Sequence, residues 1–253
     1  MTIAITREVS SRFNECEITH IDRTPIDLKT ARAQHREYTK TLAQLGCEVI
    51  QLPQEPGLPD SVFVEDAAFI LPEVAVITRP GADSRKLEIE SVAKALLPYR
   101  KLVNVTEPST VDGGDVLVVG KNVYIGLSTR SNPSAMEQIQ KLLDPYEYKV
   151  TSVQIHDCLH LKTAVTRVDD ATLLINKDWV DTHYFSDYEC IEVDASEPFA
   201  ANCLPVNGQI IYPTAFPKTS AKLEARGCKI RPVAVDELAK AEGAVTCCSL
   251  IIT

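Results

Sequence analysis

A chain of 253 residues, 45% of them hydrophobic and 24% charged, can bury a sizeable core without disulfide support. Its 35 acidic residues outnumber its 26 basic residues, and the net charge of −9 argues against nucleic acid or an anionic membrane as a partner. No apolar run reaches the length of a membrane span, and the N-terminus lacks the layout of a signal peptide. We therefore expect a cytoplasmic protein.

The predicted elements recur along the chain. A strand at 3–8 and a helix at 28–45 come first. The order strand, turn, strand, helix then follows in VFVEDAAFILPEVAVITRPG with helix 85–97, and again in GGDVLVVGKNVYIGL with helix 132–144. A third copy is HLKTAVTRVDDATLLIN, a fourth is AANCLPVNGQIIYPTA with helix 217–226, and a fifth begins at AVTCCSLIIT. A period of roughly 40–50 residues suggests radial repetition or an array.

The fifth copy stops after its first strand, and the N-terminal strand and helix could complete it. This arrangement predicts a ring of five units in which the two terminal strands lie side by side. No linker or low-complexity stretch divides the chain, so we expect one domain over residues 1–253. The alternative is a plain α/β chain whose strand–helix alternation mimics a repeat.

In such a ring the first strand of each unit runs toward the central axis. Polar residues at the same point of each unit then converge on one site. Carboxylates, an imidazole, an amine, an amide and a thiol occupy these points: Asp60, Glu65, Asp66, Asp112, Asp115, His160, Lys162, Asn202 and Cys247. This combination predicts a catalytic centre.

The thiol is one of eight scattered cysteines, and no C-x-x-C occurs, so we expect neither a disulfide framework nor a metal site. VTCCSLII reads as a buried strand, in which neighbouring side chains point to opposite faces. At most one of Cys247 and Cys248 then faces a cavity. The alternative is that both are core cysteines.

His160 lies in CLHLKTAV, which reads as a short apolar strand, and Asp112 precedes Gly113–Gly114, where the backbone is free to turn. With a thiol, these two match an acid/base and its orienting acid. The alternatives are a core histidine with a backbone partner and an acidic turn residue.

Glu65 and Asp66 interrupt PDSVFVEDAAF, which otherwise reads as a buried strand. Two adjacent buried carboxylates need a cationic or hydrogen-bonding partner. A substrate guanidinium would serve, because its planar fork matches carboxylate geometry. The alternative is an internal lysine or arginine, such as Arg79.

Seven segments in order resemble the motifs of the dimethylarginine dimethylaminohydrolase (dimethylargininase) family of guanidino-modifying enzymes: PDSVFVEDAAF, ITRPGADSRK, DGGDVLVVG, YIGLSTRSN, CLHLKTAV, FAANC and EGAVTCCSL. The resemblance as a whole runs over about residues 25–252. The resemblance implies an α/β fold, a five-bladed α/β-propeller of ββαβ units with pseudo-fivefold symmetry, closed by the N- and C-terminal strands. This agrees with the recurrence described above.

The resemblance also implies roles for single residues. Cys247 matches the nucleophile, His160 the general acid/base, and Asp112 the acid that orients this histidine. Glu65 and Asp66 match the carboxylates that hold the guanidinium. Asp60 matches a residue that engages the substrate's amino-acid head, and Arg79 and Arg130 match those that bind its α-carboxylate. Ile18 falls in the loop that closes over the site.

Two features depart from the family pattern. Family members carry Asp in the turn before the nucleophile, where this sequence has Glu242, next to the guanidino end of the substrate. One extra methylene there could alter which N-substituents fit. The N-terminal loop, SRFNECEITHIDRTPID, would form a lid; it is richer in charge than the rest of the chain and resembles the family less.

The resemblance implies a hydrolase of C–N bonds in linear amidines that needs no cofactor. It would convert asymmetric dimethylarginine to citrulline and dimethylamine through a covalent Cys247 thiouronium. The partner is then a small cationic amino acid, with neither nucleic acid nor membrane, and a homodimer is kept open. The alternatives are an arginine deiminase or a hydrolase of another N-substituted arginine, an amidinotransferase, and a catalytically silent ligand-binding protein on the same scaffold.

Overall fold

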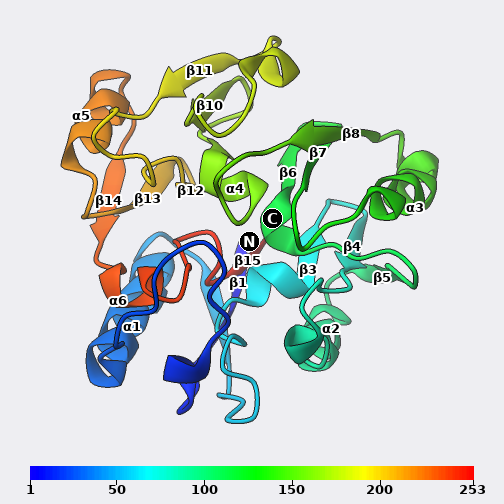
Figure 1. Cartoon of the computed structure of the whole chain (residues 1–253), viewed down its shortest axis with the longest axis horizontal. Helices are drawn as coiled ribbons and strands as arrows, with labels where there is room; N and C mark the ends of the chain where they lie inside the picture. Colours follow the sequence, from blue (N-terminus) through cyan, green and yellow to red (C-terminus); the bar gives the residue numbers. More distant parts are fainter.

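The computed structural model describes residues 1–253 and contains five three-stranded sheets, which form blades around a central axis (Figure 1). In each blade the middle strand pairs antiparallel with the inner strand and parallel with the outer one. The strands are β1 (Ile3–Arg7), β2 (Glu48–Leu52), β3 (Ala68–Ile70), β4 (Val74–Ile77), β5 (Lys101–Asn104), β6 (Val116–Val119), β7 (Asn122–Leu127), β8 (Lys149–Gln154), β9 (Val165–Arg167), β10 (Thr172–Ile175), β11 (Glu189–Glu192), β12 (Leu204–Val206), β13 (Gln209–Pro213), β14 (Ile230–Val233) and β15 (Leu250–Ile252).

The terminal strands complete the ring, as the sequence predicted. β15 pairs antiparallel with β1, with Ile3 opposite Ile252 and Ile5 opposite Leu250, and β2 pairs parallel with β1 on the other side. Each sheet is itself open. Side-chain packing therefore joins the blades, together with single backbone hydrogen bonds such as that from the Val111 amide to the Arg79 carbonyl at 2.9 Å.

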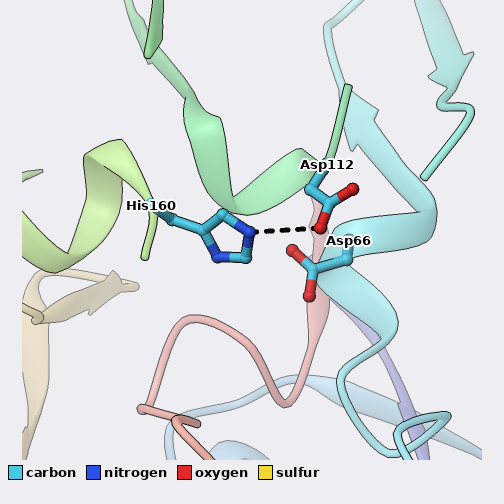
Figure 2. Close-up of side chains that lie close together, drawn as sticks. All are labelled: Asp66, Asp112 and His160. Atoms are coloured by element: carbon cyan, nitrogen blue, oxygen red, sulfur yellow. Dashed lines mark hydrogen bonds and ion pairs between the residues drawn. The ribbon is translucent and has the colours of Figure 1, made fainter. Parts of the chain in front are cut away.

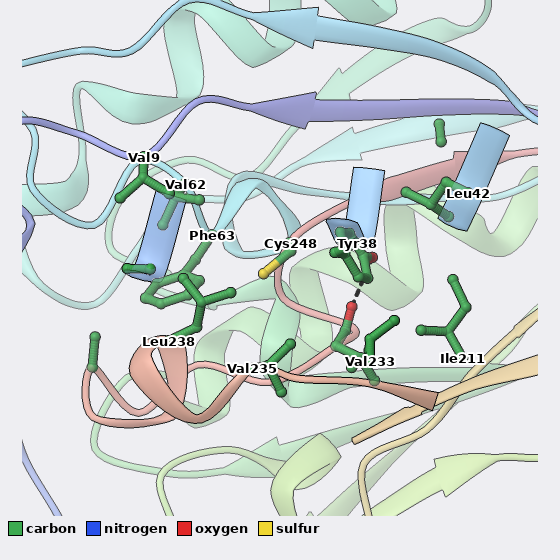
Figure 3. Packing of buried hydrophobic residues seen from close by; sticks show 14 of the residues in the cluster. Val9, Tyr38, Leu42, Val62, Phe63, Ile211, Val233, Val235, Leu238 and Cys248 are labelled. Atoms are coloured by element: carbon green, nitrogen blue, oxygen red, sulfur yellow. Dashed lines mark hydrogen bonds between the residues drawn. The ribbon is translucent and has the colours of Figure 1, made fainter. Parts of the chain in front are cut away.

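The hydrophobic core is divided into five clusters of buried residues, one between each pair of neighbouring blades. The largest joins the β12–β14 blade to β1 and includes Tyr38, Val233 and Cys248 (Figure 3). Because every blade contributes apolar residues to two clusters, no blade can bury its faces alone.

The helices are α1 (Leu28–Gln44), α2 (Glu88–Leu96), α3 (Pro133–Leu143), α4 (Leu161–Ala164), α5 (Pro217–Ala225) and α6 (Asp236–Ala239). The four predicted helices are present within three residues of their expected ends. Asp27 caps α1 by accepting from the Lys29 and Thr30 amides, and Asn132 caps α3 ahead of a proline at the first helical position. No helix has both the length and the apolar character needed to cross a membrane.

Three segments read as strands are not strands. Val64–Ala67 forms the 3-10 helix η2 ahead of β3, His160 stands just before helix α4, and Cys247 and Cys248 lie in a turn that precedes β15. Each segment is a short apolar run, and such runs do not distinguish a buried strand from a buried helical turn. The predicted strands begin only after these turns.

Candidate active site

A one-turn segment leads into the first strand of every blade and approaches the central axis (Figure 1). These segments are η2, the 3-10 helix η4 (Gly113–Asp115), α4, and turns at 198–201 and 245–248. η4 contacts both η2 and α4. The polar residues that the sequence placed at equivalent points are therefore brought together, on helical turns rather than on strands.

His160 and Asp112 form a buried pair at this meeting point. His160 Nε2 lies 3.1 Å from Asp112 Oδ2, and Asp112 Oδ1 accepts a hydrogen bond of 2.9 Å from the Gly81 amide. Figure 2 shows the Asp66 carboxylate beside both groups. A carboxylate that is fixed from its other side in this way holds the imidazole in one orientation.

The Gly113–Gly114 pair permits this packing for a reason that the sequence did not indicate. Neither glycine has a positive φ, so turn freedom is not what they provide. A Cβ at Gly114 would instead lie 2.5 Å from His160 Nδ1 and 2.8 Å from Asp66 Oδ1. The Gly114 amide donates to Asp66 Oδ1 at 2.9 Å, an approach that only a residue without a side chain allows.

Asp66 is paired with Arg85, which the sequence analysis missed. Arg85 Nη1 lies 2.6 Å from Asp66 Oδ2, and its Nη2 lies 2.8 Å from Glu88 Oε2, with all three side chains buried. Arg79, the expected arginine, pairs with exposed Glu107 and lines neither cavity of the site. The segment around Arg85 reads as a charged helix start, so its burial leaves no signal in the sequence.

Glu65 is held by a second internal cation. Its Oε1 bonds to Lys162 Nζ, and its Oε2 accepts from Thr246 Oγ1 at 2.7 Å. Asn202 Nδ2 donates to the same Thr246 hydroxyl at 3.0 Å, and its Oδ1 accepts from the Thr246 amide at 3.1 Å. Internal pairing, the alternative raised from the sequence for Glu65 and Asp66, is therefore the arrangement in this structure.

Cys247 and Cys248 face different surroundings, as predicted, although they lie in a turn. Cys248 is fully buried in the cluster that contains Tyr38 and Val235 (Figure 3). Tyr38 donates a hydrogen bond of 2.8 Å to the Val245 carbonyl and so fixes this turn against the core. Cys247 is only partly buried and lines both cavities described below.

The electrostatics of the site favour a neutral thiol beside a charged imidazole. Burial, followed by the Glu65 and Asp66 carboxylates, raises the pKa of Cys247 to about 12. Burial alone would lower the pKa of His160, but the carboxylates of Asp66, Asp115 and Asp112 outweigh it and raise this pKa to about 9. A cation placed near the thiol would oppose the carboxylates and lower the pKa of Cys247.

Two hollows meet at Cys247 and His160. The smaller, about 20 Å³, is polar and is lined by Asp60, Arg85 and Arg130 among others. The larger, about 280 Å³, extends away from it. Leu159, His160, Glu242, Gly243 and Cys247 line both. A molecule that reaches the thiol can therefore extend into a polar hollow on one side and a roomier one on the other.

The predicted lid lies over this junction. Glu242 Oε2 accepts from the Thr19 amide at 2.7 Å and its Oε1 from the His20 amide at 2.6 Å. Arg130 Nη2 donates to Thr19 Oγ1 at 2.9 Å. Glu242 thus lies at the site as expected, but its carboxylate is directed to the lid backbone.

The remaining predicted contacts divide into one that lies at the site and one that does not. Asp60 lines the polar hollow, and its Oδ2 accepts from the Glu17 amide at 3.1 Å. Ile18 lines neither hollow and packs instead against the largest core cluster, whereas His20 and Ile21 line the larger hollow. The lid residues that line the larger hollow are thus two and three positions after the predicted Ile18.

Asp66, Asp112 and His160 have side-chain ligand atoms within 4.8 Å of one another. A metal would require an unprotonated imidazole, and the raised pKa of His160 keeps it protonated at neutral pH. The carboxylate oxygens are also shared with Arg85, Gly114 and Gly81. We assign no metal to this cluster.

The chain matches the family described as N,N dimethylarginine dimethylhydrolase, eukaryotic, over residues 7–252. It is 34% identical to the N(G),N(G)-dimethylarginine dimethylaminohydrolase of Pseudomonas aeruginosa, over 88% of this chain and 89% of the relative. It is also 34% identical to the Streptomyces coelicolor protein of the same name, over 98% and 95%.

The fold agrees with these sequence matches. A cysteine-to-serine variant of the Pseudomonas aeruginosa enzyme, complexed with citrulline, superposes with a TM-score of 0.94 at 31% identity, covering 98% of each chain. Both the sequence and the five-bladed arrangement therefore lead to one assignment. This chain belongs to the dimethylarginine dimethylaminohydrolase family.

Proposed function

We propose that this protein hydrolyses N-methylated arginines, converting asymmetric dimethylarginine to citrulline and dimethylamine. The observation that carries the proposal is the position of Cys247 and the His160–Asp112 pair, at the junction of a polar hollow with two arginines and a larger hollow. The citrulline held by the Pseudomonas aeruginosa relative supports the same product.

We assign the polar hollow to the amino-acid head of the substrate. Arg85 and Arg130 offer guanidinium groups for the α-carboxylate, and Asp60 offers a carboxylate for the α-ammonium. Arg85 replaces Arg79 in this role because only Arg85 lines the hollow. The guanidinium then lies near Glu65 and Asp66, whose oxygens can accept bonds beyond those they already make.

The first half of the reaction forms a bond between sulfur and the guanidinium carbon. Binding of the substrate cation opposes the carboxylates that raise the pKa of Cys247, so the thiol loses its proton to solvent. The thiolate attacks the carbon, and protonated His160 gives its proton to the leaving nitrogen. Dimethylamine departs and a cationic thiouronium remains on Cys247.

The second half releases the product. His160, now neutral, takes a proton from water as the oxygen attacks the thiouronium carbon. The carbon–sulfur bond then breaks and restores the thiolate, the remaining hydroxyl proton passes to solvent, and citrulline is released. Asp112 holds the imidazole through both proton transfers, and the head group in the polar hollow keeps the carbon within reach of sulfur. No step requires a cofactor.

The test is a substrate panel. We expect kcat/KM to be highest for asymmetric dimethylarginine or monomethylarginine, with release of dimethylamine or methylamine, and lower for arginine. Ammonia release from arginine that exceeds amine release from both methylated compounds would contradict the proposal and identify an arginine deiminase. Transfer of an amidine to added glycine would identify an amidinotransferase, and no turnover of any compound would identify a binding protein.

The nucleophile is tested separately by covalent labelling with a haloacetamidine. Labelling should be lost in Cys247→Ala and kept in Cys248→Ala, its matched neighbour, because Cys248 is enclosed by the core. Equal labelling of both variants would remove Cys247 from its role. The single catalytic domain over 1–253, the homodimer and the cytoplasmic location also stay predictions.

A further inference from the structure

The larger hollow exceeds what the methyl groups of the proposed substrate need. A site for a single water requires roughly 10–15 Å³ on the same measure, whereas this hollow holds about 280 Å³. The polar hollow on the other side of Cys247 holds about 20 Å³. With the head group in the polar hollow, the substituted guanidinium nitrogen faces the larger one.

Apolar side chains form much of its wall, and we call this part the apolar chamber: Phe199, Pro213, Ala215, Phe216, Val235 and Ala239. Phe199 is 48% exposed, and its ring packs edge-to-face on Trp179 with centroids 4.9 Å apart. A large aromatic surface left open to solvent, and held in place by a second ring, offers apolar area that a ligand can cover.

Three of the polar side chains at the edge of the chamber already hydrogen-bond to the protein. Glu242 gives its carboxylate to the lid amides, Asp236 Oδ1 accepts from Gln34 Nε2 at 2.6 Å, and Asn202 donates to the Thr246 hydroxyl and a backbone carbonyl. An N–H group directed at the apolar wall finds no hydrogen-bond acceptor among its side chains, whereas an alkyl group there would cover apolar area.

We propose that the apolar chamber is a subsite for the N-substituent of the substrate, and that it admits alkyl groups larger than methyl, such as propyl. This inference rests on the proposed function and extends its substrate class to Nω-alkylarginines. The reaction balances as before: the C–N bond to the alkylated nitrogen breaks, and water supplies the ureido oxygen of citrulline and two hydrogens, which leave with the alkylammonium ion.

The test compares Nω-propyl-L-arginine with monomethylarginine on the whole enzyme. Each buried methylene favours binding by roughly fourfold, so we expect the propyl compound to reach at least about one-tenth of the kcat/KM of the methyl compound even if its leaving amine departs more slowly. A lower ratio overturns the inference. Turnover of neither compound would contradict the proposed function as well, so the two failures are distinguishable.

A second experiment reduces the volume of the apolar chamber by substitution. Ala239→Leu and Ala215→Leu enlarge two exposed lining residues, and Ala221→Leu on the exposed face of α5 is the matched control. We expect at least one lining variant to lower the propyl-to-methyl ratio of kcat/KM by about threefold or more, while the control changes it by less. If both lining variants behave like the control, the chamber is not the subsite.

Discussion

Glu242 is the residue whose two hydrogen bonds to the lid can be removed most cleanly. Its oxygens accept the Thr19 and His20 amides at 2.7 and 2.6 Å, and replacing it with glutamine keeps the shape of the side chain. The amide oxygen of Glu242→Gln can still accept one of these bonds, but its NH2 group faces the second backbone donor. The substitution therefore removes one charge-assisted bond and weakens the other.

The magnitude follows from these contacts. A hydrogen bond to a charged group contributes about 1.5–3 kcal/mol, and the partial exposure of Glu242 reduces this. We expect the closed lid to lose about 1–2 kcal/mol, which raises the population of the open lid by roughly five- to thirtyfold. KM for dimethylarginine should rise as the open lid becomes more populated, because lid closure contributes to substrate binding.

Amide hydrogen exchange measures this loss at single residues. Protection at Thr19 and His20 should fall by the factor given above, whereas the Glu17 amide, which bonds to Asp60, should change less. Glu224→Gln on the exposed end of α5 is the matched control and should leave all three unchanged. Unchanged exchange at Thr19 and His20 in Glu242→Gln would refute the idea that this carboxylate latches the lid.

Three further predictions concern buried charge. His160 should titrate near pH 9 by NMR, and its contribution to folding should be full below pH 6.5 and lost as the pH rises through 9; a titration near 6.5 would contradict the carboxylate effect. Burial lowers the pKa of His35 to about 4, so stability should fall by up to about 3 kcal/mol as the pH falls from 6.5 to 4, and denaturant unfolding of His35→Leu should lack this drop. Arg85→Lys should lose about 3 kcal/mol of unfolding free energy, because its buried partners are left poorly paired, whereas Arg79→Lys should lose less than about 1 kcal/mol. Equal losses of the two variants in thermal or urea unfolding would count against the buried network.

The blade recurrence could be predicted because each copy repeats its own local signals. Apolar pairs of strands, turn residues and amphipathic helices recur at similar spacing, and the incomplete last copy indicated that β15 and β1 share one blade. The helical turns that carry the site were not predicted. In Val64–Ala67 and around Cys247 the residues are apolar enough to suit a buried strand, and only tertiary packing decides between the two.

The sequence also did not show which of two nearby arginines, Arg79 or Arg85, is buried at the site. Arg79 and Arg85 lie close in sequence, and pattern alone gives no reason to place Arg85 rather than Arg79 in the site. The difference arises from η3 (Asp83–Arg85) and the start of α2, which turn Arg85 inward onto Asp66 and Glu88. Glu88 is near Arg85 in sequence, but Asp66 is 19 residues away, and its pairing with Arg85 becomes visible only in the folded chain.

The internal cations also explain how an acidic site can exist before any substrate binds. Carboxylates this close and this buried would repel one another and raise each other's pKa, so a site without cations would not stay ionised. Six carboxylates are balanced here by only four cationic side chains: Asp60, Glu65, Asp66, Glu88, Asp112 and Asp115 against Arg85, Arg130, His160 and Lys162. Burial raises the pKa of Glu88 to about 7 and that of Asp115 to about 6, so near neutral pH Glu88 is partly protonated whereas Asp115 stays mostly ionised. In the reaction that we propose, the remaining negative charge would attract the guanidinium, and it would keep the Cys247 thiol neutral until that cation is bound.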